Sequence, residues 1–147
     1  MIHKSKGKYK FQNKATYCVS SGLSPIIKAY LEQLLTNKEK SGFGIPWYYC
    51  ELQAKEQGND SYDFSVDIDL EAALEKRVRD IEELIWVFSD NEPNPCDYGV
   101  EYDFTGGSFK CVTPEPRDLY MKDMNEWNKR KKAGYELFGR VYNTLDW

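Results

Sequence analysis

The sequence contains a single histidine, His3. Catalytic systems that pair a Ser or Cys nucleophile with an imidazole base, and metal sites built from two or more imidazoles, are therefore not expected. The chain also has none of the glycine-rich motifs G-x-x-x-x-G-K, G-x-G-x-x-G and G-x-S-x-G, which hold phosphates or present a nucleophilic serine. These absences predict a protein that is not an enzyme and that binds neither a cofactor nor a catalytic metal.

Cysteine is also scarce, and the four cysteines include no Cys-x-x-Cys pair for zinc or for thiol redox chemistry. Cys18, Cys50 and Cys111 fall in strand-like runs, where a free thiol behaves as a small hydrophobic side chain. A disulfide between neighbouring strands is the alternative. No long apolar run is present, and none follows the N-terminal lysines, so we expect a soluble, cytoplasmic protein without a membrane segment.

Charge is plentiful but uneven along the 147 residues, whose 41% hydrophobic content suffices for one domain with a buried core. Residues 1–50 carry eight Lys and two Asp/Glu, whereas residues 51–103 carry sixteen Asp/Glu and only four Lys/Arg, a net charge of −12. We expect the basic residues 1–14 either to fray or to act as a flexible arm that docks on an acidic surface. The central third is a concentrated negative field, which bears on partners rather than on fold.

The stretch 61–88 changes its hydrophobic period once. Apolar residues occupy every second position from Tyr62 to Ile68, which predicts a half-buried strand. From Leu70 to Phe88 they recur at spacings of three and four, which predicts an amphipathic helix capped by Asp69. The apolar stripe that we expect to face the core consists of Leu70, Leu74, Val78, Ile81, Ile85 and Phe88.

The remaining elements follow from similar signals. Ser24-Pro25 predicts the start of a helix that ends near Asn37, and Gly106-Gly107 predicts a hairpin turn. Further strands of the sheet are expected at 47–55, 98–105 and 108–112, and residues 15–20 could form a short additional strand. A helical tail that breaks or bends near 129–134 is expected after Pro116. The predicted fold is α+β: a four-stranded antiparallel sheet with helices packed on one face, in the order α-β-β-α-β-β-α.

The outer face of that sheet would interleave carboxylates with aromatic rings. Trp86 falls away from the apolar stripe of its helix, so it is either covered by the C-terminal helix or exposed as an interface anchor. Clustered carboxylates such as Asp67, Asp69 and Asp103 could hold Mg²⁺, but acids alternate in this way on any solvated sheet face. The predicted partner-binding residues are Trp47, Tyr49, Asp63, Asp67, Asp69, Glu71, Glu75, Trp86, Glu101 and Asp103.

Several features between residues 47 and 134 occur in a recognisable order. An aromatic-rich hairpin precedes a long acidic helix and a proline-containing stop. The segment 101–105 (EYDFT), a glycine turn followed by Phe109-Lys110, and Trp127-Asn128-Lys129 ahead of Gly134 come next. In this the chain resembles the YezG-type family of bacterial immunity proteins, which neutralise LXG and related nuclease toxins. Residues 1–45 and the strand after Lys110 depart from the family pattern. The resemblance implies a non-catalytic nuclease inhibitor.

An acidic face attracts a basic partner, and nucleic-acid-handling proteins offer basic surfaces most often. We therefore expect an inhibitor of a nuclease or another nucleic-acid-binding effector, either as an immunity protein or antitoxin or as a phage anti-defence protein of the anti-CRISPR class. Direct binding of nucleic acid by this face would be repulsive. A structural or assembly subunit, for example of a phage virion, is the alternative.

Overall fold

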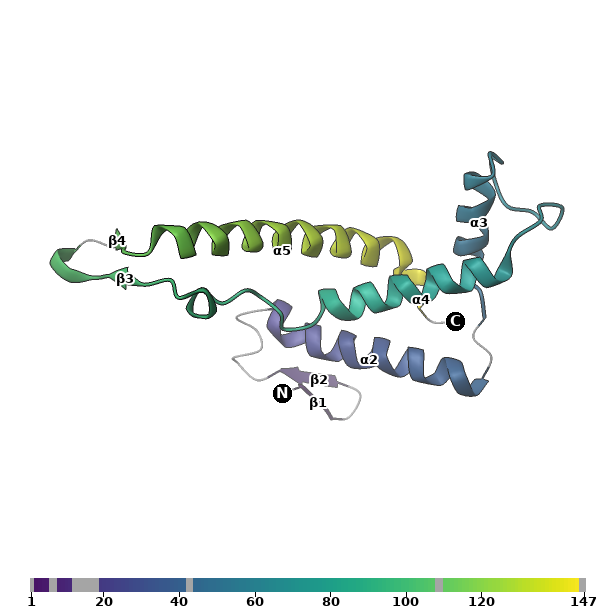
Figure 1. Ribbon diagram of the computed structural model, residues 1–147. Coiled ribbons are helices and arrows are strands. Elements are labelled where there is room, and N and C mark those ends of the chain that lie inside the picture. The colour runs from purple at the N-terminus through teal and green to yellow at the C-terminus, as the bar shows by residue number, and fades with distance from the viewer. Residues whose placement is uncertain (1, 6–7, 12–18, 42–43, 108–109, 146–147) are drawn as a thin grey trace. The chain divides into compact units, whose positions relative to one another are not determined.

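The computed structural model describes residues 2–5, 8–11, 19–41, 44–107 and 110–145. The chain divides into two compact units, unit 1 (residues 1–89 and 137–147) and unit 2 (residues 90–136). Most of the described chain is helical (Figure 1). Within the described ranges the strands form two separate antiparallel pairs, β1 (Ile2–Ser5) with β2 (Lys8–Phe11) and β3 (Tyr102–Asp103) with β4 (Lys110–Cys111). The predicted four-stranded sheet, and with it the α+β fold, is therefore wrong.

Helix α4 (Leu70–Val87) confirms the strongest helical signal of the sequence. The Asp69 side chain caps it by accepting a hydrogen bond of 3.0 Å from the backbone N–H of Ala72, and Glu71 places a negative charge in the first turn. Its buried face is rotated from the predicted one. Ile81 and Phe88 are buried as expected, but Leu74, Val78 and Ile85 are only half-buried and Leu70 is exposed. The face toward the core is formed by Ala73, Arg77, Asp80, Ile81, Leu84 and Val87.

The predicted strand at 47–55 is instead helix α3 (Trp47–Glu56), which packs against α4 at a steep angle (Figure 1). It buries Tyr49, Cys50 and Ala54. The run satisfies a period of two and a helical period equally, and its second half (ELQAKE) is rich in good helix formers. Contact with α4 selects the helical face.

The predicted strand at 62–68 is a loop of turns and bends. The Asp63 carboxylate accepts the backbone N–H of Ser65 at 2.7 Å, and the carbonyl of Asp63 accepts the N–H of Val66 at 3.1 Å. Such local side-chain bonds compete with a strand ladder, which explains why the alternating pattern fails here.

Helix α2 (Val19–Ser41) lies along α4 in unit 1 (Figure 1). The predicted start at Ser24-Pro25 is wrong, because the helix begins at Val19 and runs through Pro25. The predicted strand at 15–20 is helical at its last two residues, and residues 15–18 lie outside the described chain. The buried apolar core of unit 1 comprises Leu31, Tyr49, Ala73, Ile81, Leu84, Val87, Phe88, Val141 and Leu145.

Unit 2 contains the β3–β4 hairpin and most of helix α5 (Pro114–Val141). Gly106 and Gly107 have φ angles of 68° and 70° and lie in the connection of this hairpin. The predicted two-residue turn is wrong, however, because Asp103 pairs with Lys110 and the connection is therefore longer. The predicted strands at 98–105 and 108–112 shrink to two residues each, because Pro95–Tyr98 and Thr105–Gly107 form 3-10 turns. The predicted break near 129–134 is wrong, since α5 is continuous and buries Gly134.

Arg77 joins three segments of unit 1 from the middle of α4. Its side chain is fully buried, with an exposed fraction of 0%. The guanidinium donates to the carbonyl of Gly44, ahead of α3, and at 3.2 Å to the carbonyl of Thr144, beyond α5. Arg77 therefore fixes both connections to the core of unit 1.

We predict that Ile81→Ala lowers the free energy of unfolding by about 2–5 kcal/mol, because the Ile81 side chain is 1% exposed. Leu74→Ala, on the half-buried side of the same helix, should cost clearly less. Urea unfolding measures both variants. Equal losses of unfolding free energy in the two variants would contradict the assignment of the Ile81 side of α4 to the core.

We also predict that Arg77→Leu lowers the free energy of unfolding by about 2–4 kcal/mol, because the carbonyl of buried Thr144 and the carbonyl of Gly44 both lose their donor. Arg79→Leu, which removes an exposed guanidinium from the same helix, should change it by less than about 0.5 kcal/mol. A similar loss in both variants would contradict the connecting role of Arg77.

Candidate functional site

The candidate site is the acidic loop, residues 57–69, together with α3 before it and the start of α4 after it. Helix α3 ends where Gly58 adopts a φ of 87°, a left-handed conformation that suits glycine. The N–H of Asn59 bonds to the carbonyl of Ala54 at 3.0 Å, and this turns the chain away from the helix. The loop therefore leaves α3 in a defined direction.

Polar side chains of α3 and its C-cap hold the backbone of the acidic loop. Gln53 accepts from the N–H of Asp69 at 2.7 Å and donates to its carbonyl at 3.1 Å. Gln57 donates to the carbonyl of Asp67 at 3.0 Å, and Glu51 accepts from the N–H of Tyr62 at 2.7 Å. Three side chains thus satisfy backbone groups that a strand would satisfy with a ladder. The loop is held in one arrangement without a sheet.

Three aromatic rings form a cluster, the aromatic pad, at the surface of this loop. Trp47 of α3 meets Tyr62 at a centroid distance of 4.6 Å and Phe64 at 5.8 Å, with interplanar angles of 62° and 76°. Tyr62 and Phe64 lie 6.0 Å apart. Phe64 is 90% exposed and Trp47 51% exposed. A contiguous exposed group of aromatic rings, unlike a single exposed ring, is typical of a surface that contacts a partner.

Several carboxylates lie before and after the rings of the aromatic pad in the sequence. Asp60, Asp63, Asp67 and Asp69 are all exposed. Hydrogen bonds from the side chain and backbone of Ser65 hold the pKa of Asp63 below its ordinary value. The ion pairs Lys28–Glu32, Lys55–Glu51 and Lys76–Asp80 of the described residues do not involve these four aspartates. Their negative charge is not neutralised by the described Lys and Arg side chains.

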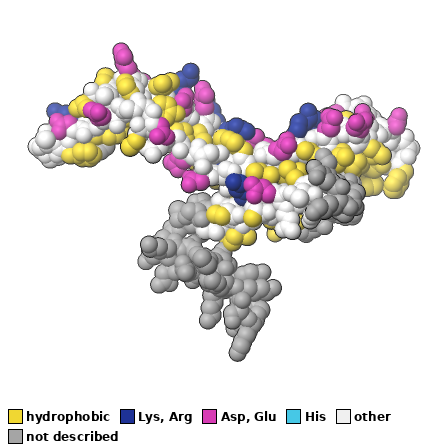
Figure 2. Space-filling view, turned by 60° about the horizontal axis from the view of Figure 1, so that its bottom comes forward, with side chains coloured by type: hydrophobic (Ala, Val, Ile, Leu, Met, Phe, Trp, Pro, Cys, Tyr) yellow, Lys and Arg dark blue, Asp and Glu magenta, His cyan; other side chains and the backbone are white. Residues whose placement is uncertain are grey.

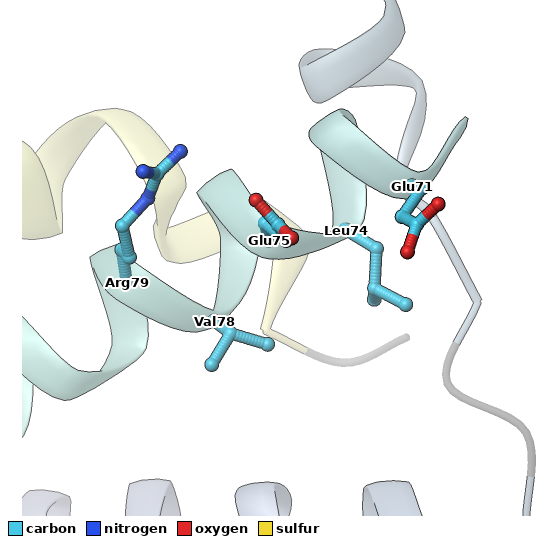
Figure 3. A pocket seen from close by; sticks show the side chains of 5 residues that line it. All are labelled: Glu71, Leu74, Glu75, Val78 and Arg79. Carbon is cyan, nitrogen blue, oxygen red and sulfur yellow. The ribbon is translucent and has the colours of Figure 1, made fainter. Parts of the chain in front are cut away.

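A shallow hollow extends the site onto α4. It has a volume of about 390 Å³ and is lined by Glu71, Leu74, Glu75, Val78 and Arg79. Figure 3 shows Leu74 and Val78 pointing to the same side of α4, toward α2. Glu71 and Glu75 are exposed, so they continue the row of acids from the loop along the helix. Figure 2 shows hydrophobic and acidic side chains next to one another where α3, the loop and the start of α4 lie, at its right-hand end.

The structure distributes the ten predicted partner-binding residues differently from the single sheet face that we expected. Six of them form one exposed group around the acidic loop: Trp47, Asp63, Asp67, Asp69, Glu71 and Glu75. Glu101 and Asp103 belong to unit 2, where the backbone N–H of Thr105 bonds to the Asp103 carboxylate at 2.8 Å and lowers its pKa. The prediction that all ten residues share one sheet face is therefore wrong.

Two aromatic residues that were predicted to bind a partner, Tyr49 and Trp86, are not exposed. Tyr49 is 2% exposed and belongs to the core, so it offers no surface to a partner. Burial, and next the nearby charge of Asp80, raise the pKa of its hydroxyl above the ordinary value. Trp86 is half-buried and packs against the core of unit 1. It lies between the two alternatives that the sequence left open.

Tyr62 and Phe64 were missed, because the alternating pattern assigned them to a buried strand face. In the loop Tyr62, Val66 and Ile68 are half-buried, whereas Phe64 is the most exposed large apolar side chain of the described residues. A signal was present. Asp63-x-Ser65 is typical of a turn in which an Asp side chain accepts a nearby backbone N–H, and a Gly-Asn-Asp-Ser run precedes it.

The His, Cys, Asp and Glu side chains of the described residues are the candidates for metal binding, and the cysteines are the candidates for thiol chemistry. No group of three or more His, Cys, Asp or Glu that could hold a metal ion occurs among them. Cys50 is buried, Cys96 is exposed, Cys111 is intermediate, and all three are free thiols. Cys18 lies outside the described residues. No described helix is long and apolar enough to cross a membrane.

Comparison with protein-family models, with curated protein sequences and with solved structures finds no match to this chain. The resemblance to YezG-type immunity proteins therefore stays a prediction.

We predict that the loop loosens in acid. The hydrogen bond from Tyr62, and to a lesser extent Lys55, lowers the pKa of Glu51. A depressed carboxyl pKa contributes stability above its unfolded value of about 4.3, and this contribution is lost as pH falls through the lower folded value. The chemical shift of the Tyr62 amide proton should move below about pH 4. Glu51→Gln should weaken this dependence, while Glu56→Gln, an exposed acid on the same helix, should leave it unchanged.

Proposed function

We propose that this protein is a non-catalytic, cytoplasmic binding protein that inhibits a nucleic-acid-handling enzyme by docking its acidic loop on the enzyme's basic surface. The observation that carries the proposal is the combination of unneutralised carboxylates with an exposed aromatic pad on a loop held in place by α3. Carboxylates give speed and orientation to association, and large rings give contact area.

The charge of the partner follows from the charge of the loop. Proteins that bind nucleic acids place Lys and Arg where phosphates lie, and these surfaces attract a row of carboxylates in the same way. The row runs through Asp60, Asp63, Asp67 and Asp69 to Glu71 and Glu75. A protein that occupies the phosphate-binding surface of a nuclease blocks its substrate without chemistry of its own. An inhibitor of this kind would be either an immunity protein or antitoxin, or a phage anti-defence protein.

An assembly subunit is the second candidate. The observation in its favour is a set of exposed apolar side chains in unit 2, which includes Phe104, Val112 and Leu119. Such side chains favour self-association. Sedimentation of the purified protein separates the two candidates, because an inhibitor should stay monomeric at micromolar concentration and an assembly subunit should not.

The proposed function is tested by capturing partners and then measuring association kinetics. The variant Asp63→Asn, Asp67→Asn, Glu71→Gln, Glu75→Gln should reduce the association rate with a basic nuclease partner by about tenfold or more at low salt. The wild-type rate should fall as the Debye length shortens from about 10 Å at 0.1 M salt to about 3 Å at 1 M, and the variant should show a flatter salt dependence.

The matched control neutralises four exposed acids elsewhere: Glu82→Gln, Glu92→Gln, Asp118→Asn and Glu136→Gln. It changes the net charge equally and should alter the rate far less. If both variants slow association to the same extent, only the overall charge matters. An unchanged rate in the loop variant would remove the acidic loop from the interface. A captured partner that is not inhibited in a nucleic-acid cleavage assay would contradict the inhibitory role.

A further inference from the structure

We infer that the partner's anchor on this surface is an arginine side chain, which stacks on the aromatic pad of Trp47, Tyr62 and Phe64 and pairs with the aspartates beside it. The inference rests on the proposed function, because arginine is abundant on the basic surfaces of nucleic-acid enzymes. It goes further by assigning the pad a ligand chemistry. The pad is a site for a planar cation rather than a general apolar contact.

The geometry of the rings fixes where the cation binds. The three centroids lie 4.6, 5.8 and 6.0 Å apart with interplanar angles between 62° and 76°. Rings this close are in contact, so no cation fits between them. The ligand must therefore approach the exposed side of the pad, which Phe64 and Trp47 dominate. The face of an aromatic ring is its electron-rich surface, and it attracts a cation within about 6 Å of the centroid.

The carboxylates select arginine over lysine. A guanidinium is planar, loses less hydration than an ammonium, stacks on a ring and still directs two N–H groups to a carboxylate. Asp63 and Asp67 flank the pad along the chain, and among the described residues no Lys or Arg forms an ion pair with either. An apolar ligand would form no ion pair with Asp63 or Asp67.

The pad is preorganised for binding. Phe64 follows Asp63, whose side chain and carbonyl accept the N–H groups of Ser65 and Val66. The N–H of Tyr62 is held by Glu51. Ordering of the loop is therefore completed in the protein before a ligand arrives, which reduces the entropic cost of binding. Phe64 itself, at 90% exposure, adds little to the fold of the monomer.

The test uses three short capped peptides that are identical except for two positions, which hold arginine, lysine or citrulline. Citrulline keeps the shape of arginine without its charge. The probe signal is the indole N–H resonance of Trp47 in a ¹H–¹⁵N spectrum, assigned with Trp47→Phe. We expect the arginine peptide to shift this resonance saturably, the lysine peptide to bind at least about threefold more weakly, and the citrulline peptide to cause no saturable shift.

The variant Phe64→Leu keeps an apolar side chain but removes the π-face. It should weaken the arginine peptide by about 3–10-fold and reduce its advantage over the lysine peptide. The matched control is Phe104→Leu, which alters a 70% exposed phenylalanine of unit 2 and should leave the affinity unchanged. Because both side chains are exposed, both variants should keep the unfolding midpoint of the wild type.

Equal binding of the arginine and lysine peptides, or an unchanged affinity in Phe64→Leu, would overturn the arginine anchor. Neither result affects the salt-dependent association rate described above, which depends on the carboxylates. Conversely, a clear arginine preference together with failure to inhibit any nucleic-acid enzyme would retain the anchor and refute the proposed function. The two hypotheses therefore fail separately.

Discussion

The buried guanidinium of Arg77 connects parts of the chain that are far apart in sequence. It lies on the core face of α4 and donates to the carbonyl of Gly44 before α3 and to that of Thr144 after α5. Burial lowers the pKa of Arg77, and its charge is stabilised by carbonyl dipoles instead of water. The tyrosine hydroxyl of Tyr30 adds a bond of 2.7 Å to the carbonyl of Leu145. The core of unit 1 therefore depends on polar contacts as well as on apolar burial.

The contacts of Arg77 and Tyr49 with the core also fix the position of α3 and, through it, of the acidic loop at the surface. With Gly44 held from the core and Tyr49 buried in it, α3 presents Glu51, Gln53 and its C-cap Gln57 to the chain that follows. These side chains hold the acidic loop by its backbone, and the loop turns its aspartates and Phe64 to the outside. An ordered loop of this kind needs no strand, because two side-chain amides and one carboxylate satisfy the backbone groups.

Charge and shape have separate roles on this surface. The carboxylates act at long range and are screened by salt, so they govern how quickly a basic partner arrives. The aromatic pad acts only in contact, so it governs how slowly the partner leaves. Glu71 and Glu75, which line the hollow, extend the row of long-range charges along α4. Trp47 and Phe64 supply the close aromatic contact. The proposed inhibitor would combine fast capture with a specific anchor.

The sequence by itself determined the helix at 70–88, its Asp69 cap, the reversal of the chain at the glycines 106–107 and the acidic character of the centre, because these follow from neighbouring residues. Five of the six acids of the site, Asp63, Asp67, Asp69, Glu71 and Glu75, were predicted for the same reason. Only the tertiary structure decided that residues 47–56 form a helix, that Tyr49 is buried and that Phe64 is exposed. In 47–55 the apolar pattern fits both a strand and a helix, and contact with α4 selects the helix. In 62–68 the Asp63 turn and the bonds from α3 replace a partner strand that the fold does not supply.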